Sequence, residues 1–205
     1  MKFRWSLIAL CLSVAGIAAA QAEDSAQRGK IAGYTCHGCH GIENYKNVYP
    51  TYSVPKVGGQ SAAYMIIALK AYASGERTHP TMHAHAASMN EQDRTDIAAF
   101  FAASKVRAAG PPVGTPPAAV ATCASCHGTD GVSDNPEYPN LAGQHRDYLE
   151  HALRDYKSGK RKNGVMAGII SGVKEEEIPA LAKFYASQKP ALCATDKIRE
   201  KGKCQ

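Results

Sequence analysis

Two copies of one pentapeptide, Cys-x-x-Cys-His, constrain what this chain of 205 residues can fold into. Two cysteines three positions apart lie on one side of a helical turn, so both thiols can bond to the vinyl groups of one porphyrin. The histidine that follows can then coordinate the iron. The motifs therefore predict two covalently bound haem c groups. The predicted attachment residues are Cys36, Cys39, Cys123 and Cys126, and the predicted proximal ligands are His40 and His127.

An internal duplication organises the rest of the sequence. A shift of 84 residues superimposes much of the chain on itself, which is how tandem repeats are recognised. The aligned pairs include Gly59 with Gly143, Tyr72 with Tyr156, Met82 with Met166, and Phe100 with Phe184. The haem motifs are 87 residues apart, which gives the first half three extra residues in the polar stretch 44–53. We interpret the chain as two copies of one domain.

The hydrophobic pattern of each copy predicts an all-α domain. In the middle helix, residues at helical spacing such as Tyr64, Leu69 and Tyr72 mark a buried face. Gly75 and Gly159 are expected to end the two middle helices, and Asn90 with Asp93 forms a predicted capping box. The helices that we expect cover 25–35, 61–74 and 91–104 in the first copy and 117–122, 145–158 and 174–188 in the second.

Each domain of about 85 residues is small for a stable core, so a covalent porphyrin would complete it. We expect the haems to be enclosed by Leu69, Ile97 and Phe100 and by their counterparts Leu153, Leu181 and Phe184. The chain without haem is predicted to be poorly structured.

The ligand on the other side of each iron decides the chemistry. Met166 is the one methionine of the second half, in a stretch that we interpret as a glycine-bearing loop. Its partner in the repeat is Met82, whereas Met65 and Met89 align with Leu149 and Val173 and are interpreted as packing residues. The sequence therefore predicts Met82 and Met166 as the distal ligands.

Histidines near Met82 offer an alternative that the sequence leaves open. His79, His83 and His85 surround it, and one of them could replace it as a ligand. The second half has Asn163, Ala167 and Ile169 at these places, which favours surface or supporting roles. His37, inside the first motif, is expected to face solvent or a propionate, and His145 and His151 to lie away from the ligands.

The ends of the chain predict export and a separate tail. Residues 1–22 have a basic start, an apolar run and a small-residue cleavage site, which indicate a signal peptide. We expect domains at 23–108 and 119–190, a proline-rich linker at 109–118, and a tail at 191–205. Cys193 and Cys204 are expected to form a disulfide in that tail.

The charge of the chain argues against nucleic-acid binding. The formal net charge of +6 falls to +4 without Lys2 and Arg4, and haem propionates reduce it further. The one dense basic run comprises Lys157, Lys160, Arg161 and Lys162. Such runs are usually solvated, but its place just before Met166 leaves open a docking role for an acidic redox partner.

These residues resemble the dihaem cytochrome c4 family over almost the whole mature chain. The resemblance rests on both motifs, on Met82 and Met166, and on segments 55–60 and 139–144. It implies two class I cytochrome c domains whose haems face one another through their propionate edges. It also implies that Pro55 and Pro139 accept hydrogen bonds from the Nδ1–H of His40 and His127, respectively. The tail from residue 189 extends past the usual end of the family.

The resemblance implies a monomeric, periplasmic electron carrier, soluble or loosely membrane-associated. Its donor would be a quinol-oxidising complex of the cytochrome bc1 type and its acceptor a terminal oxidase or another redox protein. With both axial positions filled, we expect no enzymatic activity. Two alternatives stay open: a dihaem subunit of a periplasmic dehydrogenase, such as a flavocytochrome that oxidises sulfur compounds, and a small haem enzyme or sensor with one open iron.

Overall fold

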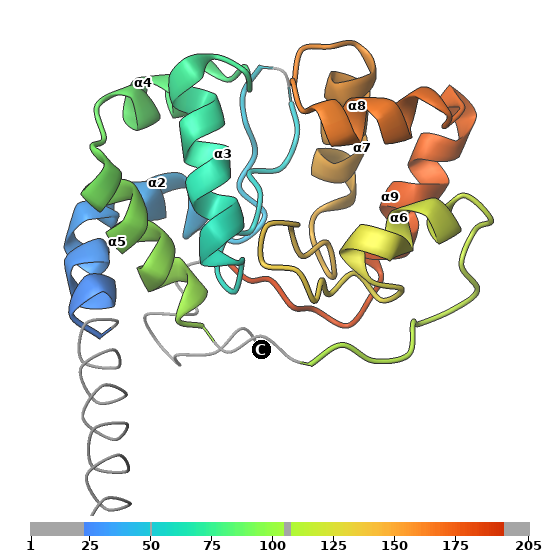
Figure 1. Ribbon diagram of the computed structural model, residues 1–205, viewed down its shortest axis with the longest axis horizontal. Helices are drawn as coiled ribbons and strands as arrows, with labels where there is room; N and C mark the ends of the chain where they lie inside the picture. Colours follow the sequence, from blue (N-terminus) through green and yellow to red (C-terminus); the bar gives the residue numbers. More distant parts are fainter. Residues whose placement is uncertain (1–22, 50, 105–107, 195–205) are drawn as a thin grey trace, which may run out of the picture.

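The computed structural model describes residues 23–49, 51–104 and 108–194. This part of the chain is helical, with isolated antiparallel bridges and no strand. Two groups of helices lie side by side, one from each half of the sequence (Figure 1). The predicted all-α fold is confirmed. The predicted signal peptide and Cys204 lie outside the described residues.

The elements of the two halves follow one another in the same order. After a helix over residues 23–32, the first half contains η1 (Tyr34–Cys36), α2 (His37–His40), α3 (Ala62–Ser74), α4 (Pro80–Ala87) and α5 (Glu91–Ala102). The second contains α6 (Val120–His127), α7 (Arg146–Lys157), α8 (Gly164–Ser171), η2 (Glu175–Glu177) and α9 (Ile178–Ala186). Helices α3, α4 and α5 thus correspond to α7, α8 and α9.

The predicted helix ends agree with the structure where a local signal exists. Gly75 and Gly159 follow α3 and α7 with φ of 78° and 77°, a left-handed conformation that suits glycine. The predicted capping box at α5 is present, because Asn90 and Asp93 each accept the other's backbone N–H. The bounds predicted as 117–122 are wrong, since α6 begins at Val120 and continues through the haem motif.

The first helix packs closely on α5. A Cβ atom at Gly29 would lie 1.8 Å from the carbonyl oxygen of Asp96, so the two backbones approach too closely for any other residue. Beside this contact, Arg28 forms a bidentate pair with the buried Asp96 carboxylate, with N–O distances of 2.7 and 2.9 Å. The guanidinium holds the pKa of Asp96 well below its ordinary value.

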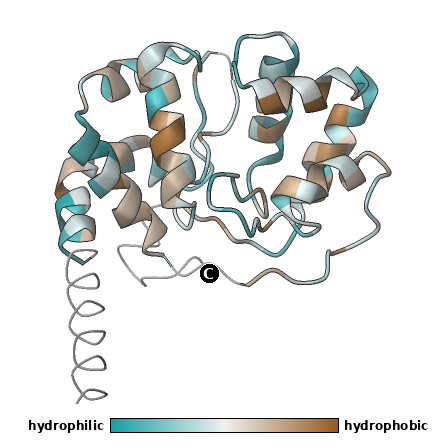
Figure 2. Cartoon of the chain, viewed as in Figure 1, coloured by the Kyte–Doolittle hydropathy of each residue, from teal (hydrophilic) through white to brown (hydrophobic). Residues whose placement is uncertain are grey.

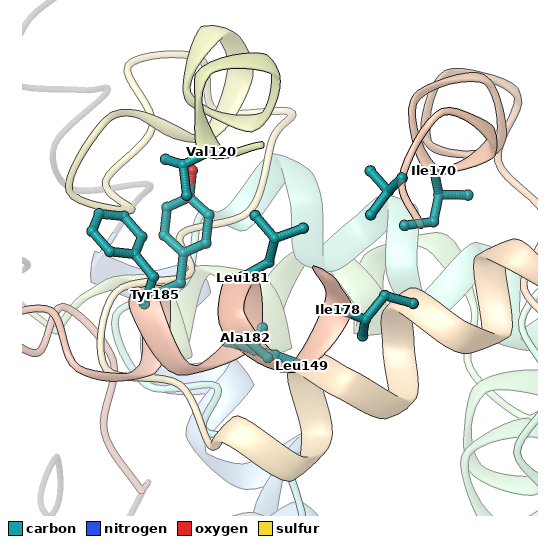
Figure 3. Packing of buried hydrophobic residues seen from close by; sticks show 9 residues of the cluster. Val120, Leu149, Ile170, Ile178, Leu181, Ala182 and Tyr185 are labelled. Atoms are coloured by element: carbon teal, nitrogen blue, oxygen red, sulfur yellow. The ribbon is translucent and has the colours of Figure 1, made fainter. Parts of the chain in front are cut away.

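Each half has its own hydrophobic core. In the second half, α9 supplies Ile178, Leu181 and Tyr185, which pack against Leu149 of α7 and Ile170 of α8 (Figure 3). The first half buries Met65, Ile97 and Phe101. Figure 2 shows hydrophobic residues on α8 and α9. None of the described helices is both long enough and apolar enough to pass through a bilayer.

The two halves meet through equivalent hydrogen bonds. Gln60 accepts the backbone N–H of Asn140 at 2.9 Å and donates to its carbonyl at 3.1 Å. Gln144, the counterpart of Gln60, makes the same two bonds with Lys56 at 3.0 and 2.9 Å. Because each glutamine pairs with a loop of the other half, the interface has approximate twofold symmetry.

Candidate functional site: a cavity shared by the two halves

The two halves line a common cavity with a volume of about 970 Å³. This is at the upper end of the usual range for ligand sites, about 300–1,000 Å³. The sequence-predicted residues converge on it from both halves. They are Cys36, Cys39, His40 and Met82 from the first half and Cys123, Cys126, His127 and Met166 from the second.

The cysteines of both motifs are free thiols in partly buried positions. Burial raises the pKa of Cys36 and of Cys123, so both stay protonated at neutral pH. Both pairs of cysteines line the cavity, where thioether bonds to the vinyl groups of a haem would form.

Each motif histidine is oriented by a proline carbonyl. His40 Nδ1 lies 2.7 Å from the carbonyl oxygen of Pro55, and His127 Nδ1 lies 3.0 Å from that of Pro139. Burial lowers the pKa of both histidines and outweighs the proline hydrogen bonds, which act in the opposite direction. Each imidazole is therefore neutral, with Nδ1–H donating to the carbonyl and Nε2 left as an electron-pair donor.

Met82 and Met166 do not lie in loops. They occupy the third residue of the short helices α4 and α8, which periodicity over eight residues did not reveal. Each helix begins at a side-chain cap that accepts the backbone N–H of the methionine: His79 Nδ1 at 3.3 Å from Met82 N, and Asn163 Oδ1 at 3.0 Å from Met166 N. The two methionines are thus held in the same way.

Two of the histidines near Met82 make structural hydrogen bonds. Besides capping α4, the ring of His79 has its Nε2 3.3 Å from Asn47 Oδ1. His83 Nδ1 lies 2.8 Å from the carbonyl oxygen of Tyr72. His85 lines the cavity and is exposed.

The expectation for His37 is wrong. Its side chain is 8% exposed and packs between aromatic rings, with its centroid 5.7 Å from Phe100 and 5.8 Å from Phe101. The turn from η1 into α2 directs this residue toward α5, where an imidazole fits against the aromatic pair.

The expected aromatic walls are also displaced by one residue. The cavity is lined by Leu69, Ile97, Leu153 and Leu181 as expected, but Phe101 and Tyr185 take the places predicted for Phe100 and Phe184. Phe100 and Phe184 belong to the same hydrophobic cores but do not line the cavity. Phe101 and Tyr185 are also paired by the shift of 84, and this signal could have identified them.

The site also contains two buried arginines: the sequence placed Arg161 only in a basic run expected at the surface, which is wrong, and gave no role to Arg77. Arg77 and Arg161 are equivalent in the repeat, are 9% and 8% exposed, and line the cavity. Their guanidinium carbons lie 4.4 Å above the rings of Tyr72 and Tyr156, a cation–π arrangement. Burial lowers the pKa of Arg77, but the surrounding tyrosines, first Tyr148, raise it well above its ordinary value. Both guanidinium groups therefore stay positively charged.

Each arginine is held by the opposite half. Arg77 donates a hydrogen bond to the Tyr148 hydroxyl at 2.6 Å, and Arg161 donates one to the Tyr64 hydroxyl at 2.9 Å. Arg77 and Arg161 also form a backbone bridge with each other. The two positive charges are consequently fixed side by side at the interface.

The cavity fits a haem in each half. Among the described residues, no carboxylate forms an ion pair with Arg77 or Arg161. Two buried cations facing one cavity are unfavourable unless an anion enters it. Haem propionates are such anions, and the paired thiols and neutral imidazoles match the rest of the group.

Comparison with known proteins agrees with this geometry. The sequence model of the cytochrome c family matches residues 118–189. Cytochrome c4 of Azotobacter vinelandii is 36% identical over 201 residues, covering 85% of this chain and 93% of that protein. A relative in Stutzerimonas stutzeri described as a thiosulfate dehydrogenase electron acceptor is 29% identical over 174 residues, covering 76% of this chain and 80% of that protein.

A solved structure extends the likeness to three dimensions. Reduced recombinant cytochrome c4 from Pseudomonas stutzeri superimposes with a TM-score of 0.63 at 25% identity, covering 80% of this chain and 98% of that one. Fold, motifs and cavity define a dihaem c-type cytochrome, a protein of electron transfer that carries two covalently bound haem c groups. Within that class, the chain belongs to the cytochrome c4 family.

Proposed function

We propose that both irons are coordinated by histidine and methionine. His40 and His127 act as proximal ligands, Met82 and Met166 as distal ligands, and Cys36, Cys39, Cys123 and Cys126 as the attachment residues. The proposal is supported by the cavity, which brings all eight side chains together in two equivalent sets. When bound, the haems supply one-electron chemistry between ferric and ferrous iron.

The protein residues then have separable roles. Pro55 and Pro139 fix the orientation of the imidazoles and increase their donor strength. The caps at His79 and Asn163 hold the methionine helices, and the thioether sulfur favours the ferrous state. Arg77 and Arg161 bind the propionate carboxylates.

The main observation in favour of an electron carrier is that each half of the cavity contains a methionine. With both axial positions filled, neither iron has a place for oxygen, peroxide or a substrate. We propose a periplasmic carrier, exported by residues 1–22, that accepts electrons from a quinol-oxidising complex and passes them to a terminal oxidase or another redox protein. The reduced protein should therefore exclude carbon monoxide until it is denatured. Binding to the native reduced protein would contradict a saturated iron.

An optical redox titration tests the ligands directly. We expect two one-electron transitions and, in the ferric state, the absorption band of a methionine–iron bond. A pyridine haemochrome assay should give two haems per polypeptide. A single transition with one haem, or a ferric spectrum without the methionine band, would refute the assignment.

A basic surface near Met166 supports an anionic partner. Lys157, Lys160 and Lys162 are exposed beside Val165, which is 55% exposed. Their counterparts in the first half are Ala73, Glu76 and Thr78, so this surface belongs to the second half alone. Basic side chains around an apolar centre favour fast encounter with an acidic redox protein.

Small redox reagents test this surface without an identified partner. Replacing Lys160 and Lys162 with Glu should slow oxidation of the reduced protein by the anion ferricyanide about tenfold at low ionic strength, and much less at high salt. Lys183→Glu, on α9, changes the net charge at another place and serves as control. The control changes the net charge by half as much, so slowing in proportion to the charge change would indicate an effect of net charge rather than docking.

A second candidate is a cytochrome subunit that accepts electrons from a sulfur-compound dehydrogenase. The relative described as a thiosulfate dehydrogenase electron acceptor favours it. Purification from the native host distinguishes the two: a carrier elutes as a free monomer, whereas a subunit retains a stoichiometric partner.

A further inference from the structure

The segment after α9 contacts both halves of the molecule. Residues 190–194 run beneath the two groups of helices (Figure 1). The N–H of Ala191 donates to the carbonyl of Ala142 in the second half at 3.1 Å. Cys193 exchanges two backbone hydrogen bonds with Gly58 in the first half, at 3.0 and 3.1 Å. Ala191, Leu192 and Cys193 are 1%, 1% and 5% exposed, so the segment is part of the interior.

The two contact points are the same position of the repeat. Gly58 and Ala142 are separated by the shift of 84, although one pairs with Cys193 and the other with Ala191. Each lies three residues after the proline whose carbonyl accepts the histidine Nδ1–H, Pro55 or Pro139. The segment therefore joins the two loops that orient the proximal histidines.

Close packing fixes the start of the segment. A Cβ atom at Gly143, where φ is 73°, would lie 2.7 Å from Pro190 Cα, so this approach requires glycine. Just before it, Gln188 accepts the N–H of Val113 in the linker at 2.7 Å and donates to its carbonyl at 3.1 Å. At the other end, Cys193 is disulfide-bonded.

We propose that residues 190–194 form a clasp that positions both proline loops and thereby tunes the two proximal histidines together. The inference rests on the proposed role of His40 and His127 as iron ligands. A hydrogen bond at Nδ1 increases the donor strength of an imidazole, which favours ferric iron. Loosening a loop weakens that bond and raises the reduction potential of the haem in its half.

Single substitutions can loosen one loop at a time, because proline lacks an N–H. Ala191→Pro removes the bond to Ala142, and Cys193→Pro removes the bond that the Cys193 N–H donates to Gly58 but leaves the bond from the Gly58 N–H. Ala191→Gly and Cys193→Ser keep the N–H and are the matched controls; the second also removes the disulfide.

At a fixed electrode potential, Ala191→Pro should raise the ferrous-to-ferric ratio of the second haem about threefold, and Cys193→Pro that of the first. The expected shift is small because the clasp acts through the loop, whereas direct loss of a hydrogen bond to a ligand costs about 10–100-fold in metal affinity or activity. The hyperfine-shifted proton resonances of the two haems, assigned with Met82→Ala and Met166→Ala, show which one responds.

Leu192→Ala provides a milder test if a proline variant does not fold. It keeps every backbone bond and should raise both potentials slightly. Unchanged potentials in all folded variants, or the same shifts in the N–H-retaining controls, would overturn the clasp. If the clasp fails this test but the wild-type protein has two haems and the methionine band, the proposed function still stands. If the wild-type protein lacks the two haems or the methionine band, the proposed function itself is refuted.

Discussion

Asn163 caps the helix of Met166 in the second half, whereas His79 performs the same task for Met82 in the first half. Around these equivalent caps the surfaces diverge. The first half has His83 and His85 nearby, and the second has exposed lysines such as Lys162. The two halves thus hold their methionines by the same kind of cap, although the capping residue itself and the surrounding surface differ. With the proposed ligands, we therefore expect the two haems to have similar coordination and unequal contact with partners.

The largest effect should follow loss of one distal ligand. Met82→Ala and Met166→Ala each open one iron, so the reduced variants should bind about one equivalent of carbon monoxide and show lower potentials at that site. Met65→Ala is the control, because Met65 lies in the first core. It should reduce the free energy of unfolding by about 2–5 kcal/mol without carbon monoxide binding. If Met82→Ala does not bind carbon monoxide while Met166→Ala does, a histidine and not Met82 is the distal ligand of the first haem.

Replacing either arginine should have a smaller effect on the haems than loss of a distal ligand, and the effect should be similar for the two arginines. Arg77→Gln or Arg161→Gln leaves propionates without a buried counter-charge, which should lower the free energy of unfolding of the haem-containing protein by about 3–5 kcal/mol. The potentials should fall, because the lost cation destabilised the more positive ferric state, and their pH dependence should steepen as propionates titrate. Lysine at either position should restore charge but not the bidentate geometry. Unchanged potentials would contradict propionate binding.

The caps test how equivalent the two halves are. His79→Asn copies the second half into the first and should leave the methionine band unchanged. His79→Ala and Asn163→Ala should each cost about 1 kcal/mol of stability, measured by denaturant unfolding. A much larger loss of the band in His79→Ala than in Asn163→Ala would reveal a function of this histidine beyond capping.

The smallest effect concerns a pH-dependent contact between the halves. Burial alone would raise the pKa of Asp147, but hydrogen bonds from the Ser53 hydroxyl and backbone N–H hold it below its ordinary value. A carboxylate whose pKa is depressed by folding stabilises the protein above its unfolded pKa, and this contribution is lost as the pH falls through the folded pKa.

Thermal unfolding measured from pH 6 down to pH 2 should therefore show a shallower acid destabilisation in Asp147→Asn than in the wild type. The side chain is 40% exposed, so the effect at neutral pH should be only about 0.5 kcal/mol. An identical acid profile for both proteins would exclude this contact as a source of pH dependence.

The sequence selected candidate residues that the structure brings together, because covalent attachment and axial ligation need fixed residue types at fixed spacing. His40, His127, Met82 and Met166 do line one cavity. Prediction from the sequence failed where the position of a side chain depends on residues that are distant along the chain. His37 is adjacent to a motif cysteine, yet its burial depends on Phe100 and Phe101, more than 60 residues away along the chain.

The repeat contained a signal for the two arginines, but the sequence alone did not reveal what it meant. The shift of 84 aligns Arg77 with Arg161, but a charged residue after a helix is usually solvated. Only the packing of the opposite half, with Tyr148 and Tyr64, buries these cations and directs them to the cavity. Helices α4 and α8 escaped prediction because eight residues carry too little periodicity.

The sequence by itself determined the helical repeat, the number of haems and the residues that we propose as their ligands, since these depend on local spacing and on register. The tertiary structure decided that both haem sites open into one cavity, that each half holds the other's arginine, and that residues 190–194 join the two proline loops. These features arise from contacts between distant segments, and such contacts leave no pattern along a single chain.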